Sequence, residues 1–244
     1  MKHFPCMAAR WLLGAAWLLV ASAAMAADGH PPAPAQWRAE IDALVAHDRA
    51  NPPPQHAVLF IGSSSIRFWT PTLAQDFPGV PVIDRGFGGS AIADSTWYAD
   101  RIVVPYHPAL IVMYAGDNDI DEGLSPQQVA DDFRAFVARV RRGLPGVPVA
   151  YVSIKPSLAR WPLWPRMREA NGLIRRWAST QRDVRFVDVA PRMLDARGRP
   201  QPRLFRADGL HMSPAGYAIW IAALKPVLAD YGFHVVAPAA HAPK

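Results

Sequence analysis

The segment HAVLFIGSSSIR, residues 56–67, joins a short apolar run to a glycine and three serines. The run from His56 to Ile61 is mostly apolar, which is typical of a strand that is buried on both faces of a sheet. Gly62 then permits a tight turn, and a serine at the start of a following helix is exposed with its backbone N–H unpaired. The segment therefore predicts a first core strand followed by three serines, any of which could be a nucleophile or a helix cap.

Further short apolar runs and amphipathic stretches alternate along the chain. Four more runs predict strands, at residues 80–83, 109–114, 147–154 and 184–189. Helices are predicted at residues 37–46, after the capping box 125–128, at residues 166–178, and in the apolar stripe that follows Pro214. This alternation predicts an α/β fold with a parallel sheet covered on both faces. Since sites in such sheets form at the carboxyl ends of the strands, the residues after each strand are the candidates for chemistry.

Residues 1–26 have the pattern of a secretory signal peptide, with Lys2 and Arg10 before the apolar run 11–20 and with Ala24-Met25-Ala26 at the cleavage position. The apolar run is short for the alternative of an uncleaved membrane anchor. We expect cleavage after Ala26 and a periplasmic or secreted protein. The single cysteine, Cys6, lies in this leader, so a disulfide, a thiol nucleophile and a thiolate metal site are excluded from the mature chain.

The mature chain is expected to hold one domain, over residues 56–232. A linker with a short helix precedes it at residues 27–55, and a tail follows at residues 233–244. The formal net charge of +6 for the whole chain falls to +4 without Lys2 and Arg10. The remaining excess is spread over several arginines, and no zinc-finger or RNA-binding signature is present, so we expect no nucleic-acid partner. The sequence leaves the oligomeric state open.

Near the C-terminus, Asp208 stands three residues before His211, and Ser213-Pro214 follows as a helix start. This spacing places a carboxylate where it can orient an imidazole, which could then act as a general base. The alternative is ordinary loop chemistry, since aspartate favours turns and caps.

The loops after the second and third strands offer groups that could bind an oxyanion. The segment 84–90 is rich in glycine but fits neither the dinucleotide nor the Walker pattern, and Asn118 follows the third strand. The acidic run at 117–121 fails as a calcium loop, because the sixth position is Glu122 and the twelfth is Gln128. An ordinary flexible loop and a polar turn are the alternatives.

Four other side chains could bind a ligand, but each also has a simpler explanation, a surface position or core packing. Arg67 and Lys155 could bind an anionic group, although a surface position is the default expectation. Trp69 and Trp164 could line an acyl or sugar pocket, although core packing is the alternative for each.

Four ordered blocks make the chain similar to the SGNH (GDSL-type) hydrolase family. They are residues 60–65, 86–89, 114–119 and 208–211, and together they span nearly all of residues 56 to 230. The resemblance implies a three-layer α/β/α, flavodoxin-like sandwich with a five-stranded parallel sheet. It implies a nucleophile at Ser64, with Asp208 and His211 completing the catalytic triad. The chain departs from the family in having Ser63 where an aspartate is usual.

The resemblance also implies an oxyanion hole formed by the backbone N–H groups of Ser64 and Gly89 and the amide of Asn118, with Gly88 as a second register. It implies ester hydrolysis through an acyl-enzyme, without metal or cofactor. The expected substrate is a small-molecule, glycan or lipid ester, and the lack of an obvious long apolar lid favours short-chain or acetyl esters. Two alternatives stay open: an O-acyltransferase acting on a carbohydrate with the same triad, and a non-catalytic carbohydrate-binding module.

Overall fold

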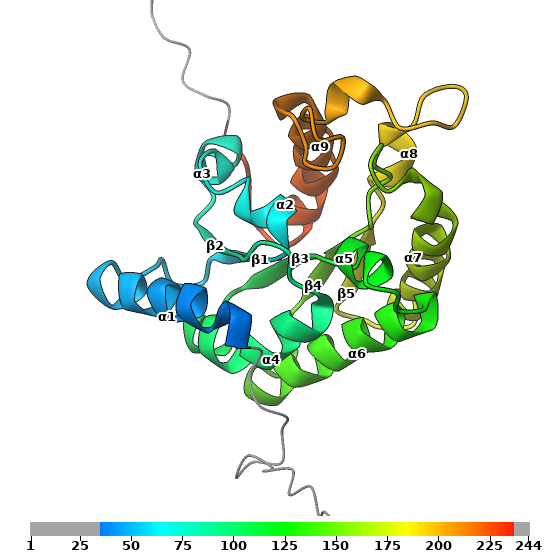
Figure 1. Cartoon of the computed structure of the whole chain (residues 1–244). Coiled ribbons are helices and arrows are strands. Elements are labelled where there is room, and N and C mark those ends of the chain that lie inside the picture. Colours follow the sequence, from blue (N-terminus) through cyan, green and yellow to red (C-terminus); the bar gives the residue numbers. More distant parts are fainter. Residues whose placement is uncertain (1–34, 237–244) are drawn as a thin grey trace, which may run out of the picture. The chain divides into compact units, whose positions relative to one another are not determined.

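The computed structural model describes residues 35–236, in which five strands form a single sheet (Figure 1). The expected signal peptide, residues 27–34 of the expected linker and most of the expected tail lie outside these residues. The strand order is β2-β1-β3-β4-β5, and every neighbouring pair is parallel. The strands are β1 (Val58–Gly62), β2 (Val82–Gly86), β3 (Leu110–Tyr114), β4 (Val149–Val152) and β5 (Val184–Val187). The predicted five-stranded parallel sheet is thus confirmed.

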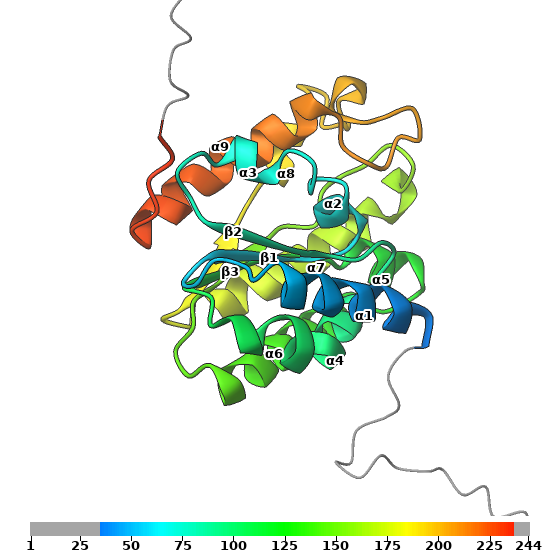
Figure 2. The ribbon, with the colours of Figure 1, turned by 90° about the vertical axis from the view of Figure 1, so that its left-hand side faces the viewer.

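Helices cover both faces of this sheet, so the described part of the chain has three layers (Figure 2). One layer holds α1 (Ala35–Ala50), α4 (Ile92–Ile102), α6 (Pro126–Gly143) and α7 (Trp164–Ala178). The other holds α2 (Ser64–Arg67), α3 (Leu73–Asp76), α8 (Ala190–Met193) and α9 (Pro214–Asp230). A hydrophobic core lies on each face of the sheet, and alternate residues of β1 belong to one or the other. Leu59 and Ile61 pack toward the first layer of helices, and Val58 and Phe60 pack toward the second.

Shorter elements connect these layers. They are α5 (Asp117–Asp121) and the 3₁₀ turns η1 (Val104–Tyr106), η2 (Trp161–Leu163) and η3 (Pro202–Leu204). Among residues 35–236, no helix is long and apolar enough to cross a membrane.

The helix starts that the sequence marks with capping residues are found where they were predicted. Ser125 and Gln128 form the expected capping box of α6, with Gln128 N–H donating to Ser125 Oγ and Ser125 N–H donating to Gln128 Oε1. Ser213 caps α9, and Pro214 is its first residue. Both starts are therefore confirmed, because a side-chain acceptor placed before the first turn satisfies backbone N–H groups that the helix leaves unpaired.

Boundaries without such signals were predicted less well. Helix α1 covers residues 35–50 rather than 37–46, because the residues added at its two ends are polar or alanine and include no large apolar side chain to mark them. Strand β2 covers 82–86 rather than 80–83, since the Val80 N–H closes a turn onto the carbonyl of Phe77 before Pro81. Helix α7 begins at Trp164, two residues earlier than predicted, with Pro165 in its first turn.

Gly62 is the last residue of β1 and lies directly against the backbone of β3. It lies in register with Gly86 of β2 and with Tyr114 of β3. Its φ of +144° is a conformation that side chains rarely adopt, and a Cβ atom built there would lie 1.7 Å from the carbonyl oxygen of Tyr114. Only glycine fits this point of the sheet, and the direction of the chain entering α2 depends on it.

We expect Gly62→Ala to unfold the protein or to lower its free energy of unfolding by more than ~3 kcal/mol, because the clash with backbone adds to the conformational cost. Gly146→Ala is the matched control, since Gly146 also has a positive φ (+77°) but has open space around it. Urea denaturation of both variants measures the difference. Equal losses of stability would show that conformation alone, and not the close approach of β1 and β3, makes Gly62 necessary.

Candidate active site

Three loops leave the sheet at one level, because Gly62 is in register with both Gly86 and Tyr114. Backbone hydrogen bonds continue one step past the strands. The Ser63 N–H donates to the Tyr114 carbonyl and the Phe87 N–H donates to the Gly62 carbonyl, both at 3.0 Å. The loops after β1, β2 and β3 therefore begin side by side at the carboxyl edge of the sheet, where the sequence predicts the polar groups to gather.

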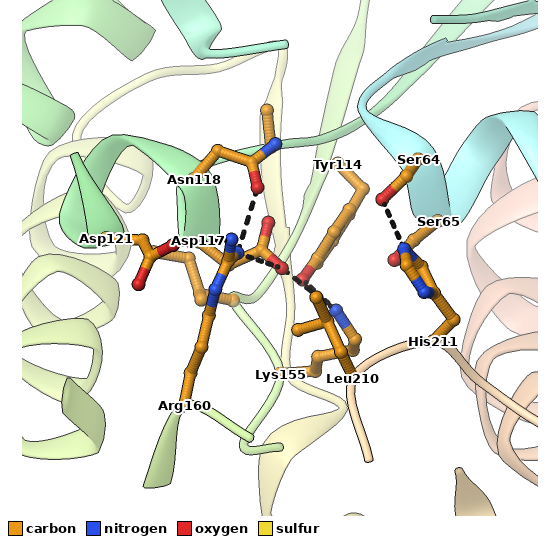
Figure 3. A network of polar contacts seen from close by, with 12 residues as sticks. Ser64, Ser65, Tyr114, Asp117, Asn118, Asp121, Lys155, Arg160, Leu210 and His211 are labelled. Atoms are coloured by element: carbon orange, nitrogen blue, oxygen red, sulfur yellow. Dashed lines mark hydrogen bonds and ion pairs between the residues drawn. The ribbon is translucent and has the colours of Figure 1, made fainter. Parts of the chain in front are cut away.

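The three serines of the first loop differ in what their hydroxyl groups contact. Ser64 is the first residue of α2, and its Oγ lies 3.0 Å from Nε2 of His211 (Figure 3). Ser63 precedes α2 in an extended conformation, and the Oγ atoms of Ser63 and Ser65 are both buried without a hydrogen-bond partner among the described residues. The structure thus pairs Ser64, and neither of its serine neighbours, with the imidazole.

Asp208 holds the other side of the same ring. Its Oδ2 lies 2.7 Å from Nδ1 of His211, while its Oδ1 accepts the backbone N–H groups of Leu210 and His211. The hydrogen bond from the His211 ring, helped by these two N–H groups, lowers the pKa of Asp208 to about 2. The carboxylate is therefore ionised at neutral pH, and with the ring proton on Nδ1 it leaves Nε2 able to accept the hydroxyl proton of Ser64.

Asn118 joins the loop after β3 to the glycine turn after β2. Its Nδ2 donates to the carbonyl of Ser90 at 2.9 Å, and Ser90 Oγ donates to the carbonyl of Phe87 at 2.9 Å. These bonds fix both ends of the turn in which Gly89 lies, with a φ of +78° that suits glycine. The structure therefore places the predicted oxyanion residues Gly89 and Asn118 in connected loops at the same edge of the sheet as Ser64.

Lys155 is buried, contrary to the surface position that was expected from the sequence. Its side chain is only 1% exposed and its Nζ donates to Tyr114 Oη and to Asp117 Oδ2, at 2.9 and 3.0 Å. Burial alone would raise the pKa of Asp117, but the charges of Lys155 and Arg160 outweigh it and lower that pKa. An ionised carboxylate and the Lys155 cation are thus buried next to Asn118, with the partly buried guanidinium of Arg160 beside them (Figure 3).

Arg160 also belongs to this site, although no sequence pattern predicts it. It lies eight residues beyond β4, and its guanidinium contacts Asn118 Oδ1, Asp117 Oδ2 and Asp121 Oδ2 at 2.9, 3.3 and 2.8 Å. The rule that sites follow strand ends indicates the loop after β4 but does not single out one arginine in it. Two of its partners, Asp117 and Asp121, belong to the acidic run that was considered as a calcium loop.

The two tryptophans considered for a pocket both pack in the core, and Trp164 also lines a cavity together with Trp161 and Arg168. Trp69 is fully buried among Phe60, Phe77, Tyr217 and Trp220, and its Nε1 donates to Asp76 at 2.7 Å. Trp164 is nearly buried and stacks on Trp161. In the part of the chain that the structure describes, no three histidine, cysteine or acidic side chains come together as a set of metal ligands.

The model of the GDSL-like Lipase/Acylhydrolase family matches residues 61–219, a span that contains the last three sequence blocks and all of the first except Phe60. The chain belongs to this family. It is therefore an esterase of the acylhydrolase class. No curated protein sequence matches the chain significantly.

Solved structures share the fold of this GDSL-like esterase at low sequence identity. A GDSL-like lipase from Bacteroides thetaiotaomicron is 21% identical, with a TM-score of 0.67 over 79% of this chain and 98% of the other. A lipase/acylhydrolase from Enterococcus faecalis is 16% identical, with a TM-score of 0.59 over 75% of this chain and 100% of the other. A mutant of an acetyl-xylooligosaccharide esterase from Geobacillus stearmophilus is 16% identical, with a TM-score of 0.58 over 76% and 98%.

Asp119 of this esterase binds the start of α4, which directly follows the glycine turn. Its Oδ1 accepts the N–H of Ile92, the first residue of α4, at 3.0 Å, and its Oδ2 is buried with no hydrogen-bond partner among the described residues. Burial raises the pKa of Asp119 to about 7. Since this pKa lies above the ordinary value of 3.8, the folded protein is favoured when Asp119 is protonated, and that stability is lost as the pH rises through 7.

We expect Asp119→Asn to be more stable than the wild type at pH 8.5, by up to ~4 kcal/mol, because asparagine keeps an acceptor for Ile92 without carrying a buried charge. At pH 5 the difference should be less than half as large. Urea denaturation at the two pH values measures it, with the exposed Asp230→Asn as the matched control. A difference of equal size at both pH values would contradict the assignment of the pH effect to Asp119.

Proposed function

We propose that this GDSL-like esterase is an exported serine hydrolase that cleaves short-chain or acetyl esters through an acyl-enzyme on Ser64. The observation that carries the proposal is the continuous path from Ser64 Oγ to His211 Nε2, and from His211 Nδ1 to Asp208. A hydroxyl, an imidazole and an ionised carboxylate in this order are the groups that acyl transfer by a serine requires. A non-catalytic binding module has no need of them.

In the proposed mechanism, Ser64 Oγ attacks the ester carbonyl while its proton moves to His211 Nε2. Asp208 keeps the ring oriented and stabilises the imidazolium. The resulting oxyanion is bound by the backbone N–H groups of Ser64 and Gly89 and by the Asn118 amide. Collapse of this intermediate breaks the bond to the alkoxy oxygen, which leaves as the alcohol with the proton from His211. Water then attacks the acyl-enzyme by the same steps and releases the acid.

The preference for a small acyl group is supported by the wall beside His211. The ring of Phe68, about 38% exposed, packs edge-on against the imidazole with centroids 4.6 Å apart. The Arg206 guanidinium covers the ring of Phe68 at 4.7 Å. An aromatic ring capped by a charge suits a short acyl group better than a long chain. That one of the structural neighbours is an acetyl-xylooligosaccharide esterase agrees with this proposal.

Export is proposed from the sequence of residues 1–26 alone. The charged start, the apolar run and the small residues at Ala24 and Ala26 form a signal-peptide pattern. A protein without cysteine after its leader is also compatible with an oxidising compartment.

Ser64→Ala is expected to lower kcat for p-nitrophenyl acetate by at least ~10,000-fold while leaving the fold intact, because Ser64 carries the hydroxyl that the structure pairs with His211. A fluorophosphonate probe should label the wild type on Ser64, as mapped by mass spectrometry, and should not label the variant. Ser65→Ala is the matched control and should retain activity and labelling. Esterase activity close to wild type in Ser64→Ala would refute the proposed nucleophile.

The acyl preference is tested with p-nitrophenyl esters of increasing chain length. We expect kcat/KM for the acetate to exceed that for the octanoate by about tenfold or more, since each poorly accommodated methylene costs part of a kcal/mol. The same assay with an added sugar acceptor separates hydrolysis from acyl transfer. A preference for octanoate would refute the proposed substrate class but would not affect the assignment of Ser64 as the nucleophile.

A further inference from the structure

We propose that Arg160 is a positioning residue for the oxyanion hole, which it serves by fixing the orientation of the Asn118 amide. The inference rests on the proposed function, in which that amide binds the oxyanion. It concerns a residue outside the four sequence blocks that mark the family, on the loop that follows β4.

The hydrogen-bond chemistry of the two neighbours of Asn118 allows only one orientation of its amide. A guanidinium has donors and no acceptor, so the atom that faces Arg160 at 2.9 Å must be Oδ1. The carbonyl of Ser90 is an acceptor, so the atom that faces it at 2.9 Å must be Nδ2. One N–H of Nδ2 is thereby used by Ser90, and the other is left to donate elsewhere. Arg160 and the Ser90 carbonyl thus act together so that Asn118 offers a donor to the substrate and not an acceptor, and Arg160 is the side chain that holds Oδ1 away from it.

The surroundings of Arg160 hold it in place for this role. Its side chain is only 14% exposed, and it is anchored by Asp121 on one side and by Asp117 on the other. Lys155 already neutralises Asp117 from within the core, so the charge of Arg160 is not consumed by that carboxylate alone. A charge-assisted hydrogen bond to Oδ1 also polarises the amide and makes its N–H groups stronger donors toward a developing oxyanion.

The experiment is a double-mutant cycle between Arg160 and Asn118, with Arg166→Met as the matched control. Arg166 binds the carbonyls of Gly123 and Leu124 after the same helix α5 and does not contact Asn118 in the described structure. Arg160→Met, Asn118→Ala and the double variant are assayed for kcat and KM on p-nitrophenyl acetate and for the rate of fluorophosphonate labelling. Circular dichroism and melting temperature report whether each variant is folded.

We expect Asn118→Ala to lower kcat by about 100- to 1,000-fold. Arg160→Met should lower kcat and the labelling rate by roughly 10- to 100-fold with KM little changed, since the lost interaction serves the transition state. In the Asn118→Ala background, Arg160→Met should have almost no further effect, because coupled residues are not additive. Arg166→Met should retain wild-type kinetics.

Two results would overturn the inference: a rise in KM at constant kcat, which would make Arg160 a substrate-binding residue, or full additivity in the cycle, which would make its role structural. If Arg160→Met does not fold, Arg160→Lys takes its place in the same cycle. A lysine ammonium can donate to one of these acceptors but cannot bind all of them as the guanidinium does. The kcat of Arg160→Lys should therefore lie between those of the wild type and of Arg160→Met. A wild type that neither hydrolyses esters nor reacts with the probe would instead refute the proposed function itself.

Discussion

The close approach of β1 and β3 at Gly62 is the constraint on which the rest of the site depends. With no Cβ atom at this position, the end of β1 packs directly against the carbonyl of Tyr114, and the backbone of Ser63 pairs with it. That pairing carries the strand register one residue past the sheet. Ser64 therefore begins α2 beside the loops that carry Gly89 and Asn118. A larger residue would separate the strands and move the hydroxyl away from the groups with which it acts.

The site is then held together by single hydrogen bonds that link one loop to the next. His211 links the last loop to Ser64, Asn118 links the loop after β3 to the glycine turn at Ser90, and Arg160 links the loop after β4 to Asn118. Each loop is anchored in a different strand end or helix start, so the sheet sets their distances. Polar groups fixed in this way before substrate arrives need little rearrangement when charge develops, which is the physical source of oxyanion stabilisation.

The sequence predicted the fold class, the strand count and the loops that hold the site, because apolar runs and capping residues are local signals. Capping at Ser125 and Ser213 gave correct helix starts for the same reason. The sequence could not predict that Lys155 is buried or that Arg160 contacts Asn118. These contacts join residues 38 and 42 positions apart and depend on the packing of β3 against β4. A lysine after a strand is exposed by default, and only the position of Asp117 on the neighbouring strand end reverses that expectation.

Burying Lys155, Asp117 and Arg160 together is costly, since the desolvation of each charge is only partly offset by its partners. The cost is understandable if the cluster balances charge beside the oxyanion hole. Asp117 precedes Asn118 and, alone, would oppose a negative charge forming there. Lys155 compensates that carboxylate from the core, whereas Asp121, about 46% exposed, draws Arg160 outward into a partly screened position. The two cations and two carboxylates of the cluster carry no net charge together, so the same cluster that orients Asn118 also offsets the carboxylate of Asp117, which would otherwise oppose the charge that Asn118 is proposed to bind.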